Sequence, residues 1–91
     1  SLIRQHKNDE AVSELKTAAS LAPDNARYVY VYAVALNSTG DPAEAITQLQ
    51  TAHERFPDDA DILSALVSFH RDADNNFAAE SYMKKASEAL E

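Results

Sequence analysis

The sequence contains no cysteine, and it has only one glycine and three prolines among 91 residues. The lack of cysteine excludes disulfides, thiolate metal ligands and cysteine nucleophiles. It leaves both a cytoplasmic and a periplasmic location open, because proteins of either compartment can lack cysteine. So few breakers, set against many alanines, favour helices over a turn-rich β fold. The composition therefore predicts an all-α protein.

Positive charge is also scarce. Eight Lys and Arg face fifteen Asp and Glu, which gives a net charge of −7. Nucleic-acid binding requires clustered cations that neutralise phosphates, so we expect no nucleic-acid partner. An acidic chain is equally unsuited to an anionic membrane surface. No apolar run approaches the length of a membrane span, and we predict no membrane insertion.

Similar residues recur at a separation of 34 along the chain. This is the separation between Pro23 and Pro57, and an aspartate follows each of these prolines. A single coincidence would mean little, but the same register relates many small and apolar residues. These are Ala11, Ala45 and Ala79; Leu15, Leu49 and Met83; Ala18, Ala52 and Ala86; Ala26 and Ala60; Val29 and Leu63; and Tyr32 and Leu66.

Residues 26–59 resemble a full repeat of the tetratricopeptide repeat (TPR) family, whose helix–turn–helix unit has the same period. The sequence of residues 40–46, GDPAEAI, is similar to the family's turn and second-helix start, and Pro57 is similar to its closing proline. Residues 60–91 depart from the pattern at Asp74, where the family has its turn glycine, and at His70, which is in phase with Leu36.

The resemblance implies a TPR-type α-solenoid of antiparallel helix pairs, with about two and a half repeats in one domain. We expect a half repeat at 1–25, a full repeat at 26–59 and a third at 60–91. Because the array begins inside a first helix, we expect the chain to be a fragment of a longer protein. The expected helices are 8–21, 25–38, 42–55, 59–72 and 75–90.

Capping residues support these helix starts. Asp41 can cap the helix that begins with Pro42, and Glu44 can reach back to complete a capping box. Asn25 and Asp59 are the expected caps after the two Pro-Asp pairs. Gly40 can adopt the left-handed conformation that the preceding turn requires.

Apolar stripes at helical spacing predict the packing faces. One stripe consists of Ala45, Ile46, Leu49 and Ala52, and another of Ala11, Val12, Leu15 and Ala18. The alanines allow close helix packing, so Ala45→Leu or Ala52→Leu is expected to overpack the contact at a cost of about 1–3 kcal/mol.

The segment 28–32, YVYVY, has the β-branched and aromatic composition of a strand. The repeat register overrides this propensity and predicts a helix. Its core stripe would consist of Val29, Tyr32, Ala33 and Leu36, which leaves Tyr30, Val31 and Val34 on other faces.

The TPR resemblance implies that first helices line a concave surface on which ligands lie. The corresponding binding candidates are Arg27, Tyr30, Val31, Val34, Asn37, Ser64, Ser68 and Arg71. The same correspondence adds Ser38, Asp61, Ala65 and Asp72, with Ile3 and Arg4 as the remnant of a preceding first helix. We expect an apolar half of the groove at Tyr30 and Val34. Neighbouring helices or a second copy could instead cover these two side chains.

The implied partner is a protein or peptide. Some family members clamp a C-terminal carboxylate with Lys, Arg and Asn side chains. Here the corresponding positions are Tyr30, Val34, Ser64 and Ser68, so we expect no such clamp.

No catalytic motif is present, and we predict a protein that is not an enzyme and has no cofactor. His6, His53 and His70 lack zinc-binding spacing, so we expect no metal site. We expect His6 and His53 to be solvated and His70 to be partly buried. Asp58, Asp59 and Asp61 are expected to complement a helix start.

Two alternative roles stay open. The last helix carries Phe77, Tyr82, Met83 and Leu90, which favours a structural role through stacking on further repeats or homo-oligomerisation. Residues 28–45 also resemble repeats attached to bacterial multihaem c-type cytochrome-like proteins, which would make the chain an accessory domain of an exported enzyme.

Overall fold

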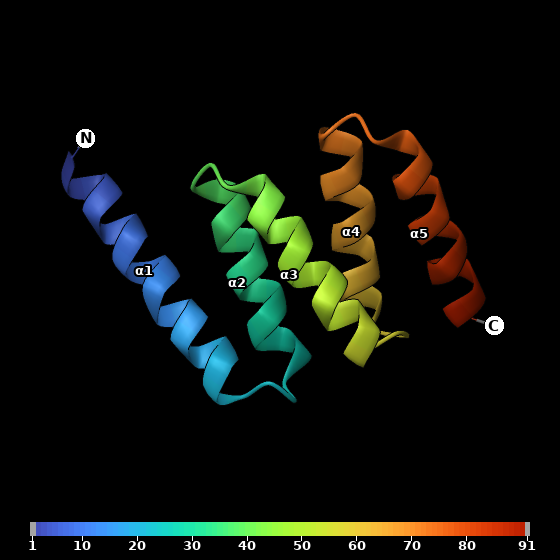
Figure 1. Cartoon of the computed structure of the whole chain (residues 1–91), viewed down its shortest axis with the longest axis horizontal. Coiled ribbons are helices and arrows are strands. Elements are labelled where there is room, and N and C mark those ends of the chain that lie inside the picture. Colours follow the sequence, from blue (N-terminus) through green and yellow to red (C-terminus); the bar gives the residue numbers. More distant parts are fainter. Residues whose placement is uncertain (1, 91) are drawn as a thin grey trace.

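The computed structural model describes residues 2–90 and is helical throughout its regular structure, which confirms the all-α prediction. Its five helices follow one another in a row (Figure 1). They are α1 (Leu2–Leu21), α2 (Ala26–Ser38), α3 (Pro42–Arg55), α4 (Ala60–Asp72) and α5 (Asn76–Ala89). Within residues 2–90, no helix is both long enough and apolar enough to cross a membrane.

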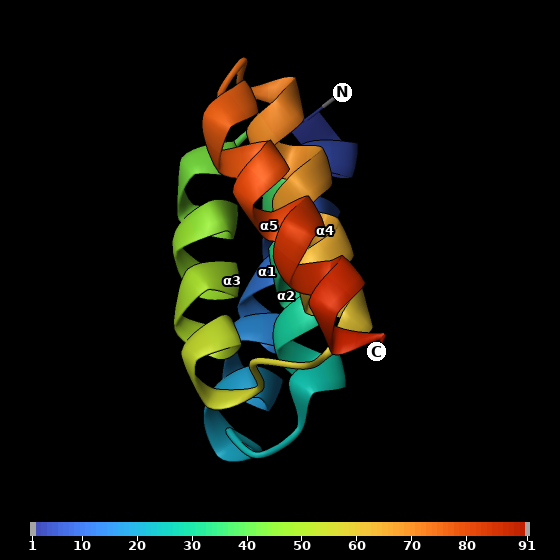
Figure 2. The ribbon, with the colours of Figure 1, turned by 90° about the vertical axis from the view of Figure 1, so that its right-hand side faces the viewer.

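Each helix packs against its neighbours in sequence, and α2 also contacts α4. The result is an extended molecule of 45 × 30 × 15 Å. Figure 2 shows α3 to one side of α2 and α4, so the helices form two layers. Helices α1 and α3 flank a common part of α2 without packing against each other among the described residues.

The first helix is longer than the repeat register predicts. The register places its start at residue 8, but α1 begins at Leu2 and runs unbroken to Leu21. Ile3 and Arg4 therefore belong to α1, and the prediction that they are the end of a separate helix is wrong. His6 stands one repeat period before Gly40, yet its Nε2 lies 2.9 Å from Glu10 Oε1 one helical turn later, as in a continuous helix.

The predicted caps are confirmed. Side-chain oxygens of Asn25, Asp41 and Asp59 accept hydrogen bonds from Arg27 N at 3.0 Å, from Glu44 N at 3.3 Å and from Ile62 N at 3.0 Å. These bonds satisfy backbone donors that have no partner within the helix. The helices begin one residue after their caps.

The capping box expected at Glu44 does not form. The Asp41 N–H donates to Leu36 O at 2.9 Å, and Glu44 Oε1 instead accepts from Gln48 Nε2 at 2.9 Å. The turn before α3 thus already uses the donor that the box would have bound.

The core lies where α2, α3 and α4 meet, and segment 28–32 is helical as the register predicts. In α2, Tyr32, Ala33 and Leu36 are buried and Val29 is half-buried. The other buried hydrophobic residues are Ala45, Leu49, Ala52, Ile62, Leu63, Ala65, Leu66 and Ala79. The alanines among these buried residues allow the helices to approach one another closely.

The stripe expected on the first helix is only partly covered. Val12, Leu15 and Ala18 are half-buried, and Ala11 is exposed. This differs from the stripe of α3 because α1 packs against α2 alone, whereas α3 packs against both α2 and α4.

Candidate functional site

Opposite the core stripe of α2 lie three of its predicted binding residues, Arg27, Val31 and Val34. Tyr30 lies nearer to the core stripe and packs against the core. Val34 is 38% exposed, while Tyr30, Val31 and Asn37 are half-buried and Arg27 is exposed. The Arg27 guanidinium lies 5.9 Å from the centre of the Tyr30 ring, which is a cation–π contact.

The predicted residues of α4 form a second, polar strip. Ser64, Ser68 and Arg71 follow one another at helical spacing and are exposed, opposite the buried Ile62 and Leu66. Since α2 contacts α4, the apolar and polar strips belong to neighbouring helices. We call these two strips together the α2–α4 face. It comprises Arg27, Tyr30, Val31, Val34, Asn37, Ser64, Ser68 and Arg71.

The additional candidates are scattered. Ala65 is buried at 7% exposure, so it belongs to the core and is unavailable to a ligand. Ser38 lines a shallow hollow between α1 and α2 together with Asn8 and Ala35. Asp61 and Asp72 are exposed on α4. Ile3 is exposed on α1.

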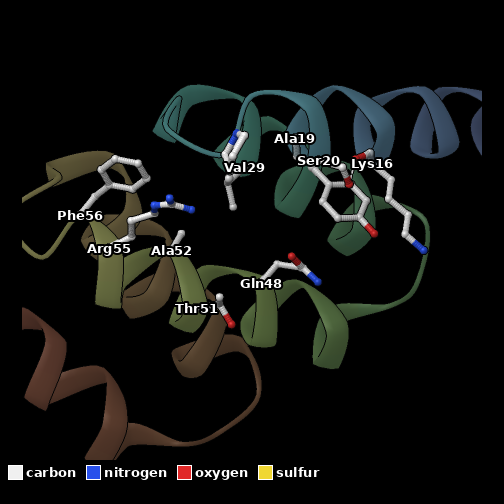
Figure 3. Close-up of a pocket in the computed structure, with 11 residues that line it drawn as sticks. Lys16, Ala19, Ser20, Val29, Gln48, Thr51, Ala52, Arg55 and Phe56 are labelled. Atoms are coloured by element: carbon white, nitrogen blue, oxygen red, sulfur yellow. Dashed lines mark hydrogen bonds between the residues drawn. The ribbon is translucent and has the colours of Figure 1, made fainter.

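A hollow that the sequence did not predict lies between α1 and α3, above α2 (Figure 3). Its volume is about 230 Å³. Figure 3 shows Lys16, Ala19 and Ser20 of α1 across from Gln48 and Thr51 of α3, with the Arg55 guanidinium directed into the space between the two helices. The remaining lining residues are Pro23, Val29, Tyr32, Ala52 and Phe56. We call this the α1–α3 hollow.

Sequence reasoning missed this hollow because its parts fit other roles. Val29, Tyr32 and Ala52 fall in the predicted core stripes, and the flanking polar residues resemble an ordinary solvated surface. The hollow exists because α1 and α3 stand apart on one side of α2, and no residue pattern along a single helix encodes that separation.

Tyr32 is the buried polar side chain of the α1–α3 hollow, with only 5% of the residue exposed. Burial raises the pKa of Tyr32 above 10.0, and the negative charges of Glu44 and Asp41 raise it further. Its hydroxyl makes no hydrogen bond within residues 2–90. Solvent reaches this hydroxyl, because it is not among the buried atoms without a hydrogen-bond partner in residues 2–90.

The side chain of Tyr82, on α5, lies between those of two histidines, His53 of α3 and His70 of α4. The Tyr82 ring stacks on His70 at a centroid distance of 5.5 Å and meets the edge of His53 at 5.6 Å. His70 is buried, and His53 is half-buried with an inaccessible Nδ1, so the prediction of a solvated His53 is wrong. Within the described part of the chain, no three His, Asp or Glu side chains converge as metal ligands would.

Comparison with known proteins agrees with the helical repeat. The tetratricopeptide repeat family model matches residues 2–69. The chain is also 30% identical to bacteriophage adsorption protein A of Escherichia coli (strain K12) over 81 residues. That alignment spans 89% of the chain but 8% of the relative's length. Neither match gives support to the resemblance to repeats of multihaem cytochrome-like proteins. On the family match and the helical array, this chain belongs to the tetratricopeptide repeat family.

Proposed function

We propose that the chain is a protein-interaction module that holds a peptide or a partner protein on the α2–α4 face. Repeats of this family generally mediate protein–protein interaction and are typically non-enzymatic scaffolds. The proposal adds a surface to that general role. It assigns the binding to the first helices of two successive helix pairs, α2 and α4.

The observation that carries the proposal is the apolar strip on the outer side of α2. Val34 is 38% exposed there and Val31 is half-buried. Tyr30, one helical turn before Val34, is half-buried because it also packs against the core. Tyrosine and arginine are frequent hot spots in interfaces, and Arg27 already lies against the Tyr30 ring. The serines of α4 and Arg71 would supply hydrogen bonds at the polar edge of such an interface.

A selection experiment tests this proposal. The immobilised chain is panned against a displayed library of random peptides, and an enriched peptide is synthesised with a fluorescent label. We expect the Tyr30→Ala, Val34→Ala double variant to bind it at least about tenfold more weakly, because both side chains would be buried by the ligand. Tyr28→Ala is the matched control, since Tyr28 is exposed on another side of the same helix.

The measurement is fluorescence anisotropy, with circular dichroism to confirm that each variant is folded. If the folded double variant retains the affinity of the unaltered chain for every enriched peptide, the α2–α4 face is not the binding surface and the proposal fails.

A second candidate role is stacking on further repeats or on a second copy. It is favoured by exposed apolar side chains on and just after α5: Phe77 and Leu90 are each 86% exposed, and Met83, which contacts Arg71 of α4, is 47% exposed. Large apolar side chains left exposed on one helix are candidates for contact with another element. Tyr82 does not belong to this set, because His53 and His70 already cover it.

Sedimentation velocity over a range of concentrations tests self-association. We expect the unaltered chain to form a concentration-dependent dimer and a Phe77→Ser, Leu90→Ser variant to remain a monomer. Leu21→Ser is a control at an exposed leucine on α1. A chain that remains monomeric throughout would contradict self-association.

A further inference from the structure

We propose that the α1–α3 hollow is a second binding site, separate from the α2–α4 face, for a peptide segment that carries an apolar side chain close to a carboxylate. The base of the hollow is apolar and includes Val29, Ala52 and Phe56. Its volume of about 230 Å³ is small compared with a drug-binding pocket, and it suits the insertion of one large side chain.

The charges that line the hollow favour an acidic partner. The chain carries a net charge of −7, yet among the described residues that line the hollow the charged side chains are those of Lys16 and Arg55. Arg55 Nη2 lies 3.1 Å from Asp24 Oδ1, but both side chains are largely exposed. Such a solvated ion pair is worth little, so a ligand carboxylate can replace Asp24 at modest cost. Lys16 has no ion pair among the described residues.

Hydrogen-bonding groups in the hollow match a peptide backbone. The Tyr32 hydroxyl makes no hydrogen bond to the described residues, and like any tyrosine hydroxyl at neutral pH it can donate one to a ligand. The Gln48 amide donates to Glu44, which leaves the Gln48 carbonyl oxygen free to accept. A peptide offers both the C=O and the N–H that these two groups require. A simple anion would leave the Gln48 oxygen without a donor.

Charged side chains at the two ends of the hollow orient the ligand. Asp41 and Glu44 raise the pKa of Tyr32, so their negative potential disfavours a carboxylate beside its hydroxyl. Arg55 stands two helical turns beyond Gln48 on α3, at the other end of the hollow. The acidic side chain of the ligand would lie near Arg55, with the apolar side chain on Val29 and Ala52.

The test uses the same random-peptide selection on the whole chain. The sequences of the enriched peptides are examined for ligands of the α1–α3 hollow. We expect a class of enriched peptides in which a large apolar residue stands within about two positions of Asp or Glu. The probe is a labelled synthetic peptide of that class, together with its Asp→Asn or Glu→Gln counterpart. The neutral counterpart should bind at least about fivefold more weakly, and the affinity of the acidic peptide should fall with added salt.

Matched variants locate the site. Thr51→Trp fills the hollow and should weaken binding at least about tenfold, whereas Gln50→Trp places the same bulk on the adjacent exposed position. Arg55→Glu and Lys16→Glu should each weaken binding. Lys7→Glu and Lys84→Glu change the net charge equally at exposed positions that do not line the hollow, and should have little effect.

The outcomes separate this inference from the proposed function. Loss of binding with Thr51→Trp, while the Tyr30→Ala, Val34→Ala variant still binds, supports a site in the α1–α3 hollow. The opposite pattern supports the α2–α4 face and overturns the hollow. The hollow is also overturned if no acidic and apolar peptide is enriched, or if Arg55→Glu affects affinity no more than Lys84→Glu.

Discussion

Gly40 and Asp74 occupy equivalent places in two successive turns of the repeat, and both have a left-handed backbone with φ of +94° and +60°. In each turn the next residue donates its N–H to a carbonyl five residues earlier. Asp41 N donates to Leu36 O at 2.9 Å, and Asn75 N donates to His70 O at 2.8 Å. Asp74 therefore performs the conformational role that glycine has in the other turn.

This equivalence predicts that Asp74→Gly stabilises the protein. A residue with a Cβ atom is disfavoured by about 1–2 kcal/mol in the left-handed region, less for Asp, while glycine costs more entropy on folding. We expect a net rise of at most about 0.5 kcal/mol in the free energy of unfolding, measured with urea.

Gly40→Ala provides the reciprocal control. An added Cβ at Gly40 would meet no atom within 4 Å, so its effect is conformational rather than steric. We expect a loss of about 1 kcal/mol. A fall in stability for Asp74→Gly would show instead that the Asp74 carboxylate contributes more than its backbone costs.

Leucine substitutions on α3 should distinguish a packed contact from an open one. Ala45 is fully buried between helices, so Ala45→Leu is expected to cost about 1–3 kcal/mol. Ala52 is also buried but lines the α1–α3 hollow, which can receive the larger side chain, so Ala52→Leu should cost less. Urea unfolding measures both, with Ala43→Leu on the exposed side of α3 as control. Equal costs would contradict the presence of usable space beside Ala52.

His70→Leu is expected to stabilise the protein. His70 is buried and its Nε2 has no hydrogen-bond partner within residues 2–90, a defect worth about 1–3 kcal/mol. The substitution loses the stack on Tyr82, worth about 0.5–1.5 kcal/mol, and Leu36 shows that leucine fits the in-phase position. The net gain in unfolding free energy should be about 1 kcal/mol.

His6→Leu on the exposed side of α1 is the matched control and should change stability by less than about 0.5 kcal/mol. Should His70→Leu unfold at a lower urea concentration than the unaltered protein, the contact between His70 and Tyr82 outweighs the missing hydrogen bond.

Stability should fall in alkaline solution through Tyr32. Because its pKa in the folded protein is raised above 10.0, the unfolded chain releases this proton first. The contribution of protonated Tyr32 to the free energy of unfolding is fully present below a pH of about 10, and it is lost as pH rises through the folded-state pKa. Tyr32→Phe should therefore make the unfolding free energy less dependent on pH above about 10.

Tyr28→Phe is the control for this pH dependence, because Tyr28 is exposed on the same helix. The measurement is urea unfolding at a series of alkaline pH values. An unchanged slope in the Tyr32→Phe variant would show that other groups account for the alkaline loss.

The repeat register predicted most of the local structure. Four helices begin within one residue of their expected positions, and the strand-like segment 28–32 is helical. The first helix is the exception. His6 holds the place of Gly40 in the register, but no turn forms there and the helix continues through it. Asp74 holds the same place in the next repeat and adopts the left-handed conformation. The identity of the residue at this place therefore does not by itself decide whether the helix ends.

From the sequence alone, the repeat period, the capping residues and the apolar stripes determine where four of the helices begin and which sides of α2 and α3 are buried. These are local properties, because hydrogen bonding at helix ends and helical spacing act within a few residues. The tertiary structure decides what lies between helices. It places His53 against Tyr82 and separates α1 from α3, which leaves the α1–α3 hollow. The physical reason is that the distance between two helices depends on the side chains of both helices and of the helix beneath them.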